Sequence, residues 1–207
     1  MAYKRGIYVA EQATSLLAPI TGSAGLQIVF GTAPINLAAD PQAAVNTLVL
    51  CYSMAEAQKA LGYSDDFEQY TLCQSMDACF KIKNIAPVIF VNVLDPHNEA
   101  HVEDVPGADM PVNNRQAQIR ASGIPVMGVL SDTVIVKPAG GEGSAYTAEV
   151  DYIVSFDAAG ICNVTVLGSG AAAQATSLHI AYTKLKPSGV TDTDIVGGYN
   201  ATTGAET

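Results

Sequence analysis

The sequence predicts an α+β protein, in which a partial α/β core carries an inserted antiparallel β-sandwich or barrel-like domain. Before residue 95, short apolar strands alternate with helical segments. After Asp95-Pro96 the helical signals disappear, and Gly, Thr, Ser and Val predominate. The short strands of this second part are separated by Gly-rich turns, which is typical of a small antiparallel β domain.

The first part contains the elements of half a doubly wound sheet. Strands are expected at 26–30 and 49–52. Ser53, with Glu56 three residues later, predicts the start of a helix over 54–61, which Gly62 ends. A second helix is expected over 67–83. The nearly continuous apolar run 87–94 is the pattern of a strand buried on both faces of a parallel sheet.

Alternating apolar residues define the strands of the second part. One strand is expected at 133–137, and a hairpin joins 152–156 to 161–167 through the turn 157–160. Leu178, Ile180 and Tyr182 alternate again. We therefore divide the chain into an extended N-terminal arm (1–23), the first half of an α/β core (24–95), a β-rich insertion domain (96–198) and the start of the return to the core (199–207).

Composition and charge exclude several classes of function. The formal net charge is −10, with 10 Lys and Arg against 20 Asp and Glu, and both halves of the chain are acidic. Nucleic acids and anionic membrane surfaces both require a cationic face. No signal peptide or spanning segment is recognisable, and the four cysteines have no CxxC spacing, which favours buried, reduced thiols.

No residue pattern indicates catalysis, a cofactor or a metal. Gly31 follows a strand, but there is no phosphate-binding glycine motif, and Gly140-Gly141-Glu142-Gly143 is read as a loop tip. His97 and His101 lie four residues apart among acidic residues, yet Pro96 and Asn98 favour a solvated connector over a metal site. His179 falls on the outer face of a strand, where a surface histidine is expected. We therefore assign no catalytic, cofactor-binding or metal residue.

The first strand of the chain has no evident partner. Gly6, Ile7, Tyr8 and Val9 have the composition of a β-strand, but polar residues 11–15 follow, and the next strand begins only at Leu26. About three strands and two helices also make a thin α/β fold. Either this α/β unit is incomplete, or something outside the chain completes it.

Three blocks of sequence, in this order, carry a resemblance to a known family. They are residues 6–34, residues 62–67 together with 87–96, and residues 152–167 together with 187–198. Over essentially its whole length the chain resembles the N-terminal part of contractile tail sheath proteins of phages and of phage-derived, R-type-bacteriocin-like particles. The order of the blocks carries the resemblance, since no single motif is diagnostic.

The resemblance implies a structural, non-enzymatic function. Family members assemble around a tail tube, and their contraction drives the tube through a cell envelope. It implies that Gly6–Val9 adds a strand to a sheet of another subunit, a form of β-augmentation. The implied partners are other copies of the chain, in a helical or ring polymer, together with the tail tube and baseplate. The implied location is the virion tail sheath, after assembly in the host cytoplasm.

Sheath proteins continue well past the block at 195–198, and the continuation completes the core sheet and supplies the tube-contacting surface. Without that part, residues 24–94 are expected to expose apolar surface, as an interface or an aggregation liability. Two other interpretations remain. One is an α/β enzyme with a β insertion that binds a small ligand near Gly31 or Asp95. The other is a surface adhesion module, which free cysteines and the lack of a signal peptide disfavour.

Overall fold

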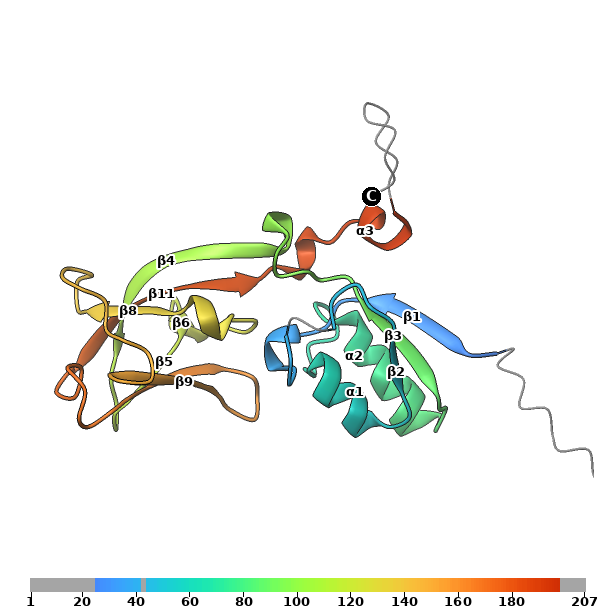
Figure 1. Ribbon diagram of the computed structural model, residues 1–207, viewed down its shortest axis with the longest axis horizontal. Coiled ribbons are helices and arrows are strands. Elements are labelled where there is room, and N and C mark those ends of the chain that lie inside the picture. Colours follow the sequence, from blue (N-terminus) through green and yellow to red (C-terminus); the bar gives the residue numbers. More distant parts are fainter. Residues whose placement is uncertain (1–24, 42–43, 198–207) are drawn as a thin grey trace, which may run out of the picture.

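A computed structural model describes residues 25–41 and 44–197, and it confirms the α+β class. Figure 1 shows two parts side by side. In one, which we call the α/β unit, helices pack on a small sheet. In the other, the β module, nearly all the residues in regular structure are in strands. The predicted arm and the predicted return segment at 199–207 lie outside the described residues.

The α/β unit is built on a three-stranded sheet, here called the core sheet. Its strands are β1 (Gln27–Gly31), β2 (Val49–Cys51) and β3 (Val88–Asn92), in the order β1-β3-β2. β1 runs parallel to β3, but β2 runs antiparallel to it. The expectation of a parallel sheet was therefore correct for one strand pair only. A 3-10 turn, η1 (Ile35–Leu37), follows β1.

Helix α1 (Met54–Leu61) has the predicted bounds. The Ser53 hydroxyl accepts a hydrogen bond from the Glu56 main-chain N–H at 3.3 Å, and the Glu56 carboxylate accepts one from Tyr52 N–H at 2.7 Å. The helix ends at Gly62, whose φ of +75° favours glycine.

The second helix was predicted to begin four residues too early. It consists of α2 (Thr71–Met76), which continues as a π-helical stretch, η2 (Asp77–Ile82). Before it, Ser64 and Asp66 accept hydrogen bonds from main-chain N–H groups and hold residues 64–69 in turns. These local side-chain bonds compete with helix formation, which explains the later start.

One face of the core sheet packs against the helices. Val88 and Phe90 of β3 are fully buried there, together with Leu61, Leu72 and Met76 of the helices. The Phe80 and Phe90 rings lie 5.9 Å apart in a tilted arrangement, which is a favourable geometry for aromatic pairs. The hydrophobic core of the α/β unit therefore lies between the sheet and the helices.

The β module contains two three-stranded antiparallel sheets. The β11 sheet has the order β4-β11-β8, and the β10 sheet has the order β5-β10-β9. A small hairpin of β6 and β7 and a 3-10 turn, η4 (Ser131–Thr133), complete it. The strands are β4 (Val102–Pro111), β5 (Gln116–Gln118), β6 (Arg120–Ala121), β7 (Ile124–Pro125), β8 (Ile135–Pro138), β9 (Tyr152–Phe156), β10 (Cys162–Val166) and β11 (Ser177–Leu185).

Both sheets of the β module contribute to one core. The predicted hairpin is confirmed, with Cys162 opposite Phe156 and Val166 opposite Tyr152. Alternate residues of β10 and β11 point into this core, as predicted from their spacing. The arrangement is an open pair of sheets and not a closed barrel. The buried residues include Met110, Ala117, Val136, Tyr152, Cys162, Val164, Val166, Leu178, Ile180 and Tyr182.

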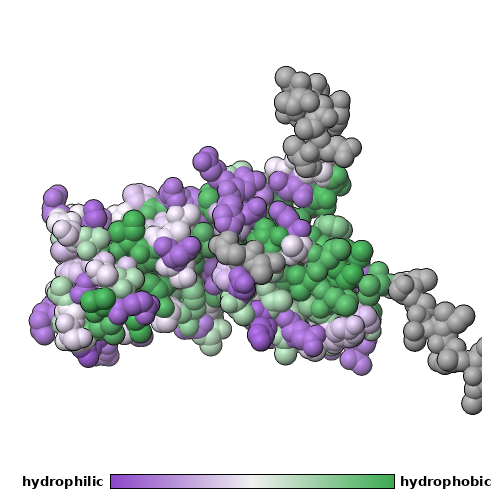
Figure 2. Space-filling view, viewed as in Figure 1, coloured by the Kyte–Doolittle hydropathy of each residue, from purple (hydrophilic) through white to green (hydrophobic). Residues whose placement is uncertain are grey.

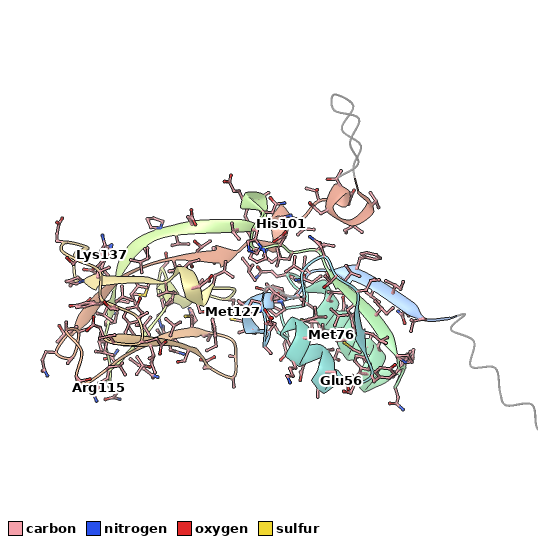
Figure 3. All side chains as sticks on the ribbon, in the orientation of Figure 1. Glu56, Met76, His101, Arg115, Met127 and Lys137 are labelled. Carbon is pink, nitrogen blue, oxygen red and sulfur yellow. The ribbon has the colours of Figure 1, made fainter. Side chains whose placement is uncertain are left out.

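The two parts of the molecule are joined by two chain segments. The outgoing segment passes through a 3-10 turn, η3 (Glu99–His101), and the returning one through η5 (Pro187–Gly189) to a short helix, α3 (Asp192–Val196). The main-chain N–H of Lys186 donates to the carbonyl oxygen of His101 at 2.7 Å. Figure 3 places His101 where the two parts meet.

Candidate functional site

The core sheet has one face that the helices do not cover. Ile28 of β1, Ile89 of β3 and Leu50 of β2 lie opposite one another across the three strands, and so point to the same side. Ile28 is 49% exposed and Leu50 is 45% exposed, and Phe30, two residues after Ile28, is 48% exposed. We call these four residues the open face.

The open face is the apolar surface that the sequence predicts for residues 24–94. Strands with apolar residues on both faces are usually covered on both faces. Here Val88 and Phe90 on the opposite face are fully enclosed, whereas on this face Val91 is buried and Ile28, Phe30 and Leu50 are exposed. Figure 2 shows hydrophobic residues gathered over the region of β1 and β3. A contiguous exposed apolar patch of this kind typically marks an interaction surface.

The two edges of the core sheet add to this surface. β1 and β2 are the outer strands, and each pairs only with β3 among the strands of the described residues. An edge strand presents unpaired N–H and C=O groups, which another strand can complete. The predicted intermolecular strand, Gly6, Ile7, Tyr8 and Val9, lies outside the described residues, so its pairing stays a prediction.

The returning segment borders the open face at one end. A groove of about 400 Å³ lies between Phe30, Val91 and Val93 on the sheet side and Thr193, Asp194 and Gly197 on the α3 side. Thr191 caps α3: its main-chain N–H donates to Asp194 Oδ2 at 2.6 Å. The Thr191 hydroxyl and N–H lower the pKa of Asp194, and the proximity of His101 lowers it further. Asp194 thus completes a capping box with Thr191 at the start of α3.

At the carboxyl end of β1, where a ligand-binding enzyme could have its site, protein side chains fill the space beside Gly31. A side chain at Gly31 would collide with Thr71. The Thr32 hydroxyl donates to the Gln69 carbonyl at 2.6 Å and accepts from Thr71 N–H at 3.1 Å. Asn92, which is fully buried, completes this network.

The Asn92 side chain joins the ends of β1 and β3. Its Oδ1 accepts hydrogen bonds from Ala33 N–H at 3.0 Å and from Leu94 N–H at 3.2 Å, while Nδ2 donates to the Leu94 carbonyl at 3.3 Å. No sequence motif singled out this residue. The signal that could have identified it is a single amide within the apolar run 87–94, because a buried amide requires hydrogen-bond partners.

The two histidines considered as metal ligands have separate environments. His97 is exposed and pairs with Asp95, whose Oδ1 lies 3.1 Å from His97 Nδ1. His101 is only 2% exposed, so the expectation of a solvated connector was wrong for this residue. Its Nδ1 accepts from Asp95 N–H at 3.1 Å, and its Nε2 lies 3.5 Å from Asp194 Oδ2. No group of three or more potential metal ligands occurs in residues 25–41 and 44–197.

His179 lies on the outer side of β11, as predicted, and it is paired there with a carboxylate. Its Nδ1 lies 2.7 Å from Asp109 Oδ1 on β4. Asp109 also accepts from Gly140 N–H at 3.0 Å, which fastens the glycine loop to the sheet. This N–H and the imidazole together lower the pKa of Asp109. Gly107 and Gly141 both lie against the ring, where a larger residue would collide with it.

The four cysteines are free and buried, as predicted. Burial raises the pKa of Cys73 to about 11 and that of Cys162 to about 12. Burial, followed by the nearby Glu56 carboxylate, raises the pKa of Cys51 to about 11. Such thiols are protonated at neutral pH and are poor nucleophiles.

Comparisons of the chain with protein-family models, with curated proteins and with solved structures gave no match. Within the described residues, no helix is both long enough and apolar enough to cross a membrane. The geometry of the chain itself therefore carries the functional argument. In the described part of the chain, the most distinctive feature is the open face, with β1 and β2 beside it as edge strands that pair only with β3.

Proposed function

We propose that the chain is a structural, self-assembling subunit of a contractile tail sheath. Its partners are other copies of itself, in a ring or helical polymer around a tail tube attached to a baseplate. In this proposal the assembled sheath is metastable, and repacking of its subunits drives the tube through an envelope. Such a transition is a change between two packings of the same interfaces and requires no catalytic residue.

The observation that carries this proposal is the open face of the core sheet. About half of each of the Ile28, Phe30 and Leu50 side chains remains to be buried. Full burial of such a side chain contributes about 1.5–3 kcal/mol, so covering the exposed half contributes about 1 kcal/mol each. Three such contributions favour association by roughly two orders of magnitude. The outer edges of β1 and β2, which pair with no further strand among the described residues, can add main-chain hydrogen bonds to this gain.

The alternative function, a ligand-binding enzyme, receives less support from the geometry. The part of its expected site at Gly31 is occupied by the hydrogen-bonded side chains of Thr32, Thr71 and Asn92. A ligand there would have to displace protein groups that already satisfy one another. We therefore propose that the chain is not an enzyme.

Light scattering and negative-stain electron microscopy of purified chain, over a range of concentrations, test the proposal. We expect concentration-dependent polymers that are rings or helices. Phe30→Glu should weaken association at least about tenfold, because it places a charge on the open face. Ile124→Glu is the matched control: Ile124 is 69% exposed, but it lies in the β module. Deletion of residues 1–20 tests the predicted arm separately.

Two results would contradict this proposal. One is a monomer at every concentration. The other is equal association of the Phe30→Glu and Ile124→Glu variants, which would place the interface away from the core sheet. A third result would separate the two parts of the proposal. If polymers form without residues 1–20 but not in the Phe30→Glu variant, the open face is an interface and the predicted arm is not required for assembly.

A further inference from the structure

A polar groove on the β module has a lining unlike the rest of this acidic chain. Its volume is about 440 Å³, within the range of small-molecule sites. The lining contains four amide side chains, one arginine and one proline, and no carboxylate, although the chain has 20 acidic residues. These residues are Pro111, Asn113, Gln116, Gln118, Arg120 and Asn163.

The strands fix the backbone positions of three of the four amide residues of this groove, Gln116 and Gln118 on β5 and Asn163 on β10. Gln118 of β5 lies directly opposite Asn163 of β10, and Gln116 lies opposite Thr165. Their strand neighbours Ala117 and Ile119 are fully buried in the core of the β module. The alternation of a strand therefore directs Gln116 and Gln118 to the outer side of the β10 sheet. Little backbone freedom would be lost when a ligand binds there.

Most of the hydrogen-bonding capacity in the groove is unused. Within the described residues, the side-chain amides of Asn113 and Gln118 make no hydrogen bond. Asn163 Nδ2 donates to the Ile161 carbonyl at 3.1 Å, and this leaves its Oδ1 available as an acceptor. Arg120 Nη1 donates to the Gly123 carbonyl at 2.9 Å, which positions the guanidinium and leaves its other N–H groups available.

We propose that this groove binds an oligosaccharide, with preference for a sugar that carries a carboxylate. An amide presents one acceptor and two donors side by side, and so pairs with neighbouring hydroxyl groups, each of which both donates and accepts. Arg120 supplies the planar donor group that suits a carboxylate. A single cation is too little for a nucleic acid backbone. No aromatic ring lines the groove, so the expected Kd is weak, about 1 mM.

This site is separate from the open face. Arg115, in the turn between Asn113 and Gln116, lies at the end of the β module remote from the α/β unit (Figure 3). Subunits joined through the core sheet would leave the groove accessible. Saccharide binding is therefore independent of the proposed sheath assembly, and either proposal can fail without the other.

Ligand-observed saturation-transfer NMR on the full chain tests this inference, because it works for monomers and for large assemblies alike. The probes are digalacturonic acid, cellobiose as a neutral sugar, and acetate as a free carboxylate. We expect transfer to both sugars, with the acidic one binding more tightly. Gln118→Ala and Asn113→Ala should each weaken the binding of both sugars several-fold. Arg120→Ala should abolish the preference for the acidic sugar.

Gln74→Ala is the matched control, because Gln74 is an exposed amide on α2 of the α/β unit. Its saturation transfer should equal that of the unaltered chain. The inference is overturned if neither sugar shows transfer at about ten times the expected Kd. It is also overturned if acetate competes fully with digalacturonic acid while cellobiose does not bind, since Arg120 would then be a simple anion site. If the Gln118→Ala and Asn113→Ala variants bind the sugars as tightly as the unaltered chain does, the sugars bind elsewhere and the inference is overturned.

Discussion

Replacement of Asn92 by Leu should destabilise the α/β unit more than any other isosteric change of a polar residue in the core sheet. The side chain is 0% exposed, and its Oδ1 is the acceptor for the main-chain N–H groups of Ala33 and Leu94. Both of those residues are also fully buried. Leucine fills the same volume but leaves two buried donors without an acceptor.

The expected loss follows from these two N–H groups. A buried donor without a partner costs about 1–3 kcal/mol, so the substitution should lower the free energy of unfolding by about 2–6 kcal/mol. This is a large fraction of the roughly 5–15 kcal/mol that stabilises a typical domain. Urea denaturation, followed by circular dichroism, measures it as a shift in the midpoint at constant slope.

Asn113→Leu is the matched control for this experiment, because the same chemical change falls on an exposed residue of the β module. It should change the free energy of unfolding by less than about 0.5 kcal/mol. If Asn92→Leu costs less than about 1 kcal/mol, the two N–H groups are satisfied in another way, and the reasoning is refuted.

Three further predictions follow from other contacts. Gly62→Ala should lower the free energy of unfolding by about 1–3 kcal/mol in urea denaturation, because φ is +75° and the new methyl group would collide with the Pro34 carbonyl; an unchanged midpoint would contradict this. Main-chain N–H groups of Thr147 and Ala171 lower the pKa of Asp151. Its stabilising contribution is therefore complete above the unfolded value of about 4 and is lost as pH falls through the folded value. Urea midpoints between about pH 2 and 7 should thus fall less steeply with acid in Asp151→Asn than in the unaltered chain. Finally, Ellman's reagent at about pH 8 should label the native thiols of Cys73 and Cys162 far more slowly than those of the urea-unfolded chain, since burial holds their pKa values near 11 and 12. Rapid labelling of the native chain would show that these thiols are accessible.

The features that could be predicted from sequence are those that neighbouring residues determine. Ser53, Glu56 and Gly62 define α1 through hydrogen bonds and dihedral angles within one helical segment. The β9–β10 hairpin is also local, because its turn and its alternating residues are contiguous. Periodicity correctly identified the buried side of β10 and β11. The late start of α2 was missed because side chains in the preceding turn compete with the helix.

The features that could not be predicted depend on residues far apart in the chain. Asp109 and His179 are 70 residues apart, and Ala33 and Asn92 are 59 apart. Hydropathy predicted buried strands, and it cannot say whether a second layer is present over an apolar face. The open face was expected only through the resemblance to sheath proteins. The amide groove was not expected at all, because no motif marks the stretch 111–120, and the pairing of β5 with β10 is needed to bring Asn163 beside it.

The meeting of the outgoing and returning segments has a consequence for how this architecture can vary. Lys186 N–H bonds to the His101 carbonyl at 2.7 Å, and Gly189 lies so close to the Ala100 carbonyl that no larger residue fits. The two ends of the stretch between these points therefore lie as close together on the α/β unit as the ends of one short loop. The size of this stretch can grow or shrink over evolution without moving the strands beneath it. The β module is thus an insertion whose two ends meet at one hydrogen-bonded crossing, and Leu185 at the end of β11 also packs into the core of the α/β unit.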